Sequence, residues 1–170
     1  MKWLAVITCL VSAISMRAQP AEAQVSNRGI EPFETAMPAM LPERFIDITK
    51  AWAQAFTRKD GGYTASDVTA NSITISAFKK NAFRYQNTGE TVENKIRYSL
   101  VISFTQSSYT LKFVVSDIYG DNDVLLTYKL PNYYKPDGTL KEGYDGLETS
   151  LKATINEIVQ SHYSYVVNYK

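Results

Sequence analysis

The side chains of this 170-residue chain that could do chemistry are few. Asp117, Asp121 and Asp123 cluster in the run DIYGDND, and clustered carboxylates on a loop suit calcium. Their spacing misses the EF-hand pattern, and Gly-Asp-Asn-Asp is typical of a turn. We therefore interpret the run as a solvated turn, with a calcium site as the alternative, and we expect no cofactor.

A single histidine, His162, limits the catalytic options further. A three-histidine zinc site and an H-E-x-x-H helix are impossible with one histidine. A Ser-His-Asp triad could form only through His162, and no G-x-S-x-G turn accompanies it. We expect His162 to pack or cap near the C-terminal end of a helix, where an imidazole interacts well with the helix dipole.

Loop residues between 117 and 145 provide two weaker possibilities. Tyr133 and Tyr134 could form a platform for a sugar or a peptide, because the ring stacks and the hydroxyl forms hydrogen bonds. The other interpretation is that the tyrosines of the chain pack in the sheet and shield its rim. Glu142 and Asp145 could form a carboxylate pair of the glycosidase kind, and a hydrolase that uses such loop carboxylates is our alternative function.

The first 23 residues have the pattern of a secretory signal peptide. After a basic second residue, Trp3–Ile14 form an apolar run, and Ala21-Glu22-Ala23 offers small residues where a signal peptidase reads. The run is shorter than the roughly 20 residues that a membrane span needs. We therefore expect cleavage after Ala23, or after Ala18, and an exported protein. The alternatives are an uncleaved membrane anchor and a lipid on Cys9.

Composition narrows the choice of partner. Removal of residues 1–23 takes away two of the 18 basic and one of the 17 acidic residues, which leaves 16 of each. A formal net charge of zero argues against nucleic acid, which needs a basic face. Cys9 is the sole cysteine, so the exported chain would have neither a thiol nor a disulfide. We expect a periplasmic or extracellular protein of the bacterial envelope without a transmembrane span, and an envelope protein or a glycan as its partner.

Residues 24–42 separate the leader from a single domain, which we assign to residues 43–170. The segment contains three prolines, one glycine and no clean periodicity, a composition that favours a tether. The alternative is a short arm that Ile30, Phe33 and Met40 hold against the surface of the domain.

Periodic apolar residues predict a helix at each end of the domain. The first runs from about Glu43 to Arg58. The second begins near Tyr144 or Gly146, and residues 165–167 either extend it or form a tail strand. The two apolar stripes are Phe45, Ile48, Trp52, Ala55 and Phe56, and Leu147, Leu151, Ile155, Ile158 and His162.

Alternation of apolar and polar residues predicts strands between the helices. The strongest signal is an antiparallel hairpin over residues 95–119 with its turn at 106–108. The weaker signals are a strand pair over 67–78, a turn at 87–90 in a looser connection, a short strand over 124–130 and a loop over 131–143.

These elements predict a two-layer α+β domain, an antiparallel meander sheet with both helices on one face. Strand parity assigns alternate apolar residues of the hairpin to the covered face and mostly polar residues to the opposite, open face. The candidate binding residues on the open face are Arg97, Ser99, Val101, Lys112 and Val114. We therefore predict a non-enzymatic binding domain or a structural subunit, and a structural subunit would add strands to the sheet edge of a partner.

Several segments resemble a known family. They are the helix with Ala51-Trp52, the strand ending in Ser76-Ala77-Phe78, the hairpin from Lys95-Ile96-Arg97-Tyr98-Ser99-Leu100 to Tyr109-Thr110-Leu111-Lys112-Phe113, and its end Ser116-Asp117-Ile118-Tyr119. Together they look like an exported Gram-negative bacterial family of unknown function with a TATA-binding-protein-like (TBP-like) fold. The resemblance covers about residues 43–162 and implies a fold and an exported location. It implies no activity, and the likeness to a DNA-binding fold carries no function here.

Overall fold

A five-stranded antiparallel sheet backed by two helices forms the main body of the computed structural model, which describes residues 20–169 apart from the side chain of Asp121. In chain order the elements are β1 (Val25–Ser26), β2 (Gly29–Ile30), β3 (Phe33–Ala36), α1 (Pro42–Thr57), η1 (Arg58–Asp60), β4 (Tyr63–Ser66), β5 (Ser72–Asn87), β6 (Glu90–Phe104), β7 (Ser108–Tyr119), η2 (Asp121–Asp123), η3 (Leu130–Tyr133) and α2 (Leu147–Asn168). The sheet has the order β3-β7-β6-β5-β4, and β1 and β2 form a separate hairpin.

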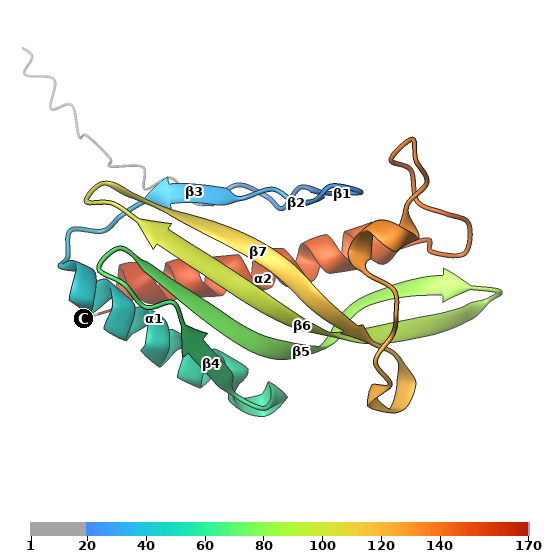
Figure 1. The fold of residues 1–170 in the computed structure, drawn as a ribbon, viewed down its shortest axis with the longest axis horizontal. Coiled ribbons are helices and arrows are strands. Elements are labelled where there is room, and N and C mark those ends of the chain that lie inside the picture. The colour runs from blue at the N-terminus through green and yellow to red at the C-terminus, as the bar shows by residue number, and fades with distance from the viewer. Residues whose placement is uncertain (1–19, 170) are drawn as a thin grey trace, which may run out of the picture.

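Both helices lie on one face of the sheet, and Figure 1 looks onto the other, open face. Alternate residues of β6 and β7, such as Leu100 and Phe113, are buried in the core with the predicted stripe of α2 from Leu147 to His162. Each large apolar side chain buried there contributes roughly 1.5–3 kcal/mol. The predicted two-layer α+β class, with both helices on one face of an antiparallel sheet, is confirmed.

Helix α1 occupies nearly the residues expected for it. Pro42 is its first residue, a position where the missing N–H of proline costs no hydrogen bond. After η1 the chain leaves the helix at Gly61, whose φ of 106° is a conformation that glycine adopts without strain. Ala55, expected on the apolar stripe, is exposed at its border.

Neither helix in the described part of the chain is long and apolar enough to cross a membrane.

The strand pair predicted over 67–78 lies differently along the chain. Its first strand is β4, and Val68 lies in an exposed turn instead. β5 continues through the segment expected to be a looser connection, with a bulge between Lys79 and Phe83 that interrupts the alternation of side chains. Thr88 and Gly89 then both have positive φ, the type I′ geometry that joins two strands tightly.

The short strand predicted over 124–130 does not form. Asn122 and Asp123 have positive φ and turn the chain back, and Leu125 makes a single bridge to Tyr119. Val124 and Leu125 are both more than half exposed. The run of consecutive apolar residues lacks the alternation of a half-buried strand, so no face of it could be covered completely.

Residues 24–42, expected to be a tether or an arm, contain three short strands and the start of α1. β3 pairs with β7 at the edge of the main sheet, and Phe33 is buried in the core. Ile30 and Met40 are partly buried against that core. The segment therefore lies against the domain. The predicted signal peptide falls mostly on residues 1–19, which lie outside the described residues.

Candidate functional site

The five residues predicted to bind a partner come from β6 and β7 and lie on the open face. Ser99 pairs with Val114 and Val101 pairs with Lys112 across the two strands, so these four form one patch. Ser99 and Val101 are half-buried, whereas the other three are exposed. Arg97 lies four residues before Val101, roughly 13 Å along β6. The structure thus places all five on one surface that neither helix covers.

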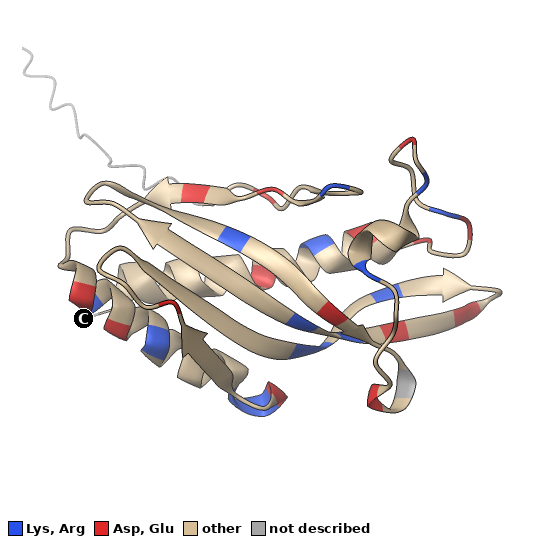
Figure 2. Cartoon of the chain, viewed as in Figure 1, with Lys and Arg blue, Asp and Glu red and all other residues tan. Residues whose placement is uncertain are grey.

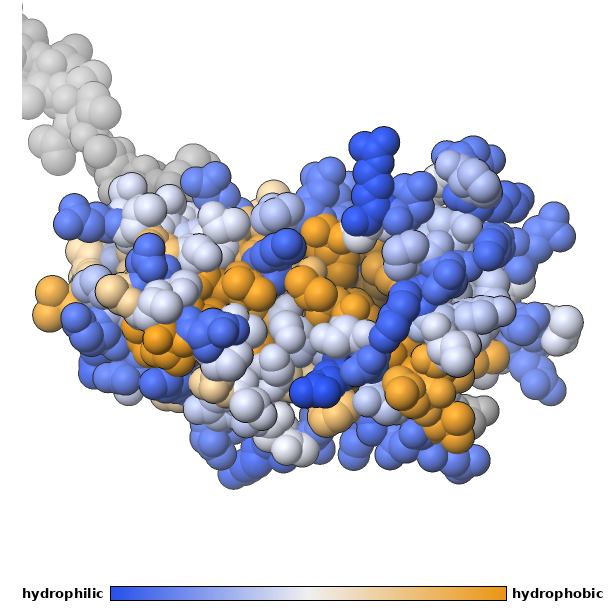
Figure 3. Space-filling model, viewed as in Figure 1, coloured by the Kyte–Doolittle hydropathy of each residue, from blue (hydrophilic) through white to orange (hydrophobic). Residues whose placement is uncertain are grey.

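This surface is mixed in character. Figure 3 shows apolar side chains in the middle of the face, bordered and interrupted by hydrophilic ones. Val114 is 38% exposed, an unusual position for a large apolar side chain in the middle of a sheet. Beside it, the hydroxyls of Ser76 and Ser99 lie 2.8 Å apart and hydrogen-bond each other. An apolar centre with a polar rim is the usual layout of a protein-binding surface.

A groove of about 340 Å³ runs along β7 beside the patch. Its floor is Lys112–Val115, one wall is Arg28–Ile30 of the β1–β2 hairpin, and the other wall is Lys129–Pro131. Ile30, Val114 and Leu130 make much of the lining apolar. Two of the five predicted residues, Lys112 and Val114, therefore line this groove and also lie on the open face.

Three cations line this groove, and they differ in their partners. The ammonium of Lys129 donates to Asp117 Oδ1 at 2.9 Å and to the carbonyl of Ser116 at 2.6 Å. Arg28 and Lys112 make no ion pair with any described residue. Figure 2 shows basic residues both on β7 and on the β1–β2 hairpin. The groove thus carries two cationic side chains that are free to meet an anionic ligand.

Sequence reasoning missed Arg28 and Lys129 because each reaches the groove from a segment without periodicity. Arg28 follows a two-residue strand in the expected linker, and Lys129 precedes a short 3-10 helix in the expected loop. No local pattern indicates that either residue contacts β7. Only the pairing of β3 with β7 brings the hairpin to this edge.

Tyr133 and Tyr134 are not the exposed platform considered from the sequence, because they are only 1% and 4% exposed. The ring of Tyr133 packs against Tyr85, Tyr128 and Tyr144 at centroid distances of 6.2, 5.9 and 4.9 Å. Burial raises the pKa of the Tyr133 hydroxyl. The cluster agrees with the other interpretation, in which tyrosines pack at the rim of the sheet.

The carboxylates proposed for calcium have partners of their own. Asp117 pairs with Lys129, and Asp123 Oδ1 accepts from the ammonium of Lys95 at 2.6 Å. The side chain of Asp121 lies outside what the structure describes. No group of three or more His, Cys, Asp or Glu residues within the described residues could hold a metal ion.

His162 packs in the core between the two helices. Its Nε2 lies 3.1 Å from the hydroxyl of Thr49, and its ring contacts Phe45, Trp52 and Tyr109. Burial lowers its pKa from 6.5 to about 3. Helix α2 continues to residue 168, so His162 does not cap it. A neutral imidazole enclosed by rings cannot reach a substrate.

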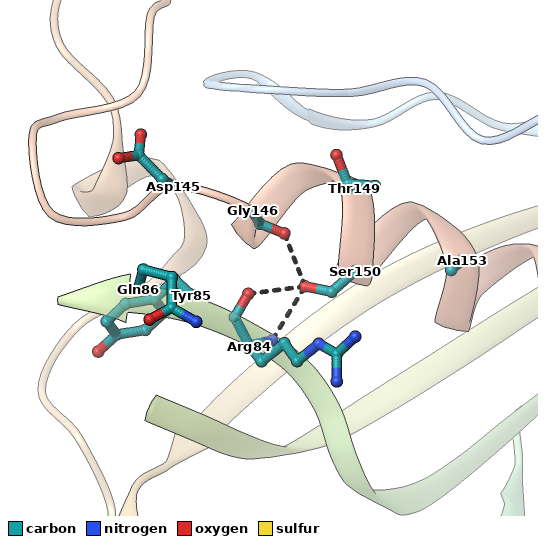
Figure 4. Close-up of a pocket in the computed structure, with 8 residues that line it drawn as sticks. All are labelled: Arg84, Tyr85, Gln86, Asp145, Gly146, Thr149, Ser150 and Ala153. Carbon is teal, nitrogen blue, oxygen red and sulfur yellow. Dashed lines mark hydrogen bonds between the residues drawn. The ribbon is translucent and has the colours of Figure 1, made fainter. Parts of the chain in front are cut away.

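A hollow of about 400 Å³ lies between β5 and the start of α2 (Figure 4). Ser150 Oγ accepts from the backbone N–H of Arg84 and lies within 2.9 Å of the carbonyls of Arg84 and Gly146, so this hydroxyl links the two elements. Asp145 is the one carboxylate that lines the hollow, and Glu142 is not part of the lining. Glu142 and Asp145, the carboxylate pair considered from the sequence, therefore do not both line this hollow.

Comparison with solved structures shows the fold. The chain is similar to a DUF4468 family protein from Bacteroides ovatus, with a TM-score of 0.57 and 9% identity over 86% of this chain and 88% of that one. It is also similar to a TBP-like protein from Parabacteroides distasonis, with a TM-score of 0.52 and 13% identity over 82% and 93% of the two chains. No family model and no curated protein matches the chain. The TBP-like fold implied by the sequence resemblance is confirmed.

Proposed function

We propose that this protein is an exported domain of the bacterial cell envelope that binds a partner through the open face of its sheet and catalyses no reaction. The observation that carries the proposal is the uncovered patch of Ser99, Val101, Lys112 and Val114. Burying an apolar residue such as Val114 against a partner would be favourable, and the neighbouring cation would select the partner's charge.

The partner we propose is an envelope protein or a glycan, and not a nucleic acid. A formal net charge of +1 over the whole chain supports this choice, because DNA and RNA binding depends on neutralising many phosphates. Asp117 and Glu93 also lie on β7 and β6, so the strands of the open face carry acidic as well as basic residues. The hydrolase alternative would need a second carboxylate beside Asp145 in the hollow of Figure 4.

Reversing the two open-face cations, Arg97→Glu with Lys112→Glu, is expected to abolish capture of the envelope partner and to leave the fold intact. Both side chains are exposed, and surface substitutions usually change stability by less than about 0.5 kcal/mol each. The measurement is pull-down from native envelope with the tagged domain as bait, alongside denaturant unfolding of the same variant.

The matched control reverses two exposed cations of η1, Arg58→Glu with Lys59→Glu, which gives the same change in net charge away from the patch. This control should capture the partner as well as the original protein does. If the open-face variant is folded and captures the partner at the unchanged level, the open face is not the binding surface.

Export predicts that the N-terminus of the protein isolated from the envelope is Gln24 or Gln19, and the two sites differ in the contacts that they leave in place. The carbonyl of Pro20 accepts from Gln160, and the N–H of Ala23 donates to Asn156 Oδ1 at 2.8 Å. Cleavage after residue 18 keeps both contacts, whereas cleavage after residue 23 removes them. N-terminal sequencing decides between the two, and a protein that still begins at Met1 would contradict export.

Two substitutions test the cleavage site directly. Signal peptidases need small side chains at the positions they read, so Ala18→Tyr should block cleavage after residue 18. Ala21→Tyr should block only cleavage after residue 23, and Ala21 is exposed, so the fold should tolerate the change. Loss of the original N-terminus in the first variant alone identifies cleavage after residue 18, and its loss in the second variant alone identifies cleavage after residue 23.

A further inference from the structure

Four tyrosine rings surround a further hollow of the molecule, of about 270 Å³, which we call the tyrosine pocket. None of the open-face patch residues lines it, and no charged residue belongs to its lining. The lining residues are Tyr85, Leu126, Thr127, Tyr128, Tyr133 and Tyr144. Pockets for drug-sized ligands begin near ~300 Å³, so this one has room for roughly one six-membered ring with its substituents.

Tyr85 and Tyr144 are held side by side by the backbone. The N–H of Gln86 donates to the carbonyl of Asp145 at 3.0 Å, which joins β5 to the loop before α2. The rings of the two tyrosines that precede these residues lie 4.9 Å apart between centroids, at an interplanar angle of 68°. This wall of the pocket is therefore in place before any ligand arrives, which lowers the cost of ordering it on binding.

Tyr133 is buried at the centre of the cluster and forms the floor of the pocket. Its ring meets Tyr144 at 88° and Tyr128 at 85°, with centroid distances of 4.9 and 5.9 Å. In such T-shaped pairs the edge of one ring covers part of the face of the other. The N–H of Leu126 donates to the carbonyl of Ile118 at 2.8 Å, so the segment that carries Tyr128 is fixed to β7.

The outer wall of the pocket is open to solvent. Tyr128 is 49% exposed, and Thr127 beside it is exposed as well. The hydroxyls of Thr127, Tyr128 and Tyr144 hydrogen-bond no described residue. Val124 and Leu125 are exposed earlier in the same segment, and Figure 3 shows apolar side chains gathered near η2, where this segment begins.

The chemistry of the lining decides which ligand fits. Because no carboxylate lines the pocket and neighbouring rings cover part of each other's faces, it lacks the cage that a quaternary ammonium needs. An apolar side chain would leave the three unpaired hydroxyls without water or a partner, which costs free energy. A neutral sugar ring suits both features, because its C–H face stacks on a tyrosine ring and its hydroxyls bond those of the pocket.

We propose that the tyrosine pocket binds one neutral pyranose unit of a glycan. Tyr128 is the stacking residue, and the hydroxyls of Thr127 and Tyr144 are hydrogen-bond partners of the sugar. The pocket shares no residue with the open-face patch, so the inference goes beyond the proposed function and does not depend on it. The protein then carries a sugar site in addition to its partner-binding face.

The test uses the purified protein and four uncharged probes, the methyl β-pyranosides of glucose, galactose and N-acetylglucosamine and the methyl α-pyranoside of mannose. Saturation-transfer difference NMR with irradiation of the aromatic protons should give signals from at least one probe, strongest for the C–H protons of one face of its ring. Titration to about 20 mM covers the millimolar Kd that a single small ring reaches. Tetramethylammonium and N-acetylphenylalanine amide are the rival probes. No binding of any pyranoside, or tighter binding of either rival, would overturn the proposal.

Variants of Tyr128 show whether its ring carries the binding. Tyr128→Ala should weaken binding of the sugar at least fivefold, whereas Tyr128→Phe, which keeps the ring, should weaken it less than threefold. The matched control is Tyr169→Ala, because Tyr169 is also an exposed tyrosine but lies at the C-terminal end of α2, and it should leave binding unchanged. Amide NMR spectra check that each variant is folded, and a folded Tyr128→Ala that binds the sugar at the original affinity would contradict the site.

Failure of this inference is distinguishable from failure of the proposed function. If no pyranoside binds while the open-face variant still loses capture of the envelope partner, the sugar site is wrong and the open face remains the binding surface. If a pyranoside binds in the expected way while capture is unaffected by the open-face variant, the sugar site holds and the proposed function is wrong.

Discussion

Replacing Trp52 with alanine is expected to destabilise the domain by about 3–5 kcal/mol, the usual cost of removing a large buried aromatic side chain. Trp52 is 1% exposed and stacks on Phe56 at a centroid distance of 5.4 Å. Its indole N–H donates to Ser161 Oγ of α2 at 3.0 Å, and its ring packs against His162, which is also in α2. The residue thus joins α1 to α2. Denaturant unfolding monitored by circular dichroism measures the loss.

Two further variants show where that loss comes from. Trp52→Phe keeps a large ring but removes the donor to Ser161, so its cost should exceed that of Ser161→Ala, which is expected near 1 kcal/mol. Leu41→Ala is the surface control, because Leu41 is 72% exposed, and it should change stability by less than about 0.5 kcal/mol. A loss below about 1 kcal/mol for Trp52→Ala would contradict the packing of α1 against α2.

The elements that could be predicted from the sequence are those whose own periodicity is long. The β6–β7 hairpin alternates over many residues, and each helix repeats its apolar residues over several turns. A period of two also assigns Arg97, Ser99, Val101, Lys112 and Val114 to one face, because no other placement buries their apolar neighbours. The open face was therefore predictable from strand parity alone.

The remaining features depend on contacts between distant segments. β3 has four residues between two prolines, and it is a strand because β7 offers it an edge. The bulge after Lys79 interrupts the alternation of β5, so half of that strand has no clear signal. Burial of Tyr133 depends on Tyr85 of β5 and Tyr144 before α2, neither of which is near it in sequence. The groove beside β7 is likewise made by three separate segments.

The stability of the domain is expected to fall as the pH is lowered from 7 to 5, because His162 cannot take up a proton in the folded state. Its pKa is about 3 when folded, against 6.5 in an unfolded chain. Below pH 6.5 the unfolded state therefore binds a proton that the folded state does not. The free energy of unfolding should decrease by up to about 1.4 kcal/mol per pH unit until the folded pKa is reached. Between pH 7 and pH 5 the loss from this group is about 2 kcal/mol.

The variant His162→Phe isolates this contribution. Asp and Glu side chains ordinarily titrate near pH 4, so they add little between pH 7 and pH 5. The hydroxyl of Thr49, which now lies 3.1 Å from Nε2, could bond the carbonyl one turn earlier in α1 instead. Urea unfolding at the two pH values should therefore show the loss of about 2 kcal/mol in the original protein and little pH dependence in the variant. The same slope in both proteins, or a His162 ring that titrates near pH 6.5 in NMR spectra of the folded protein, would contradict a buried neutral imidazole in this core.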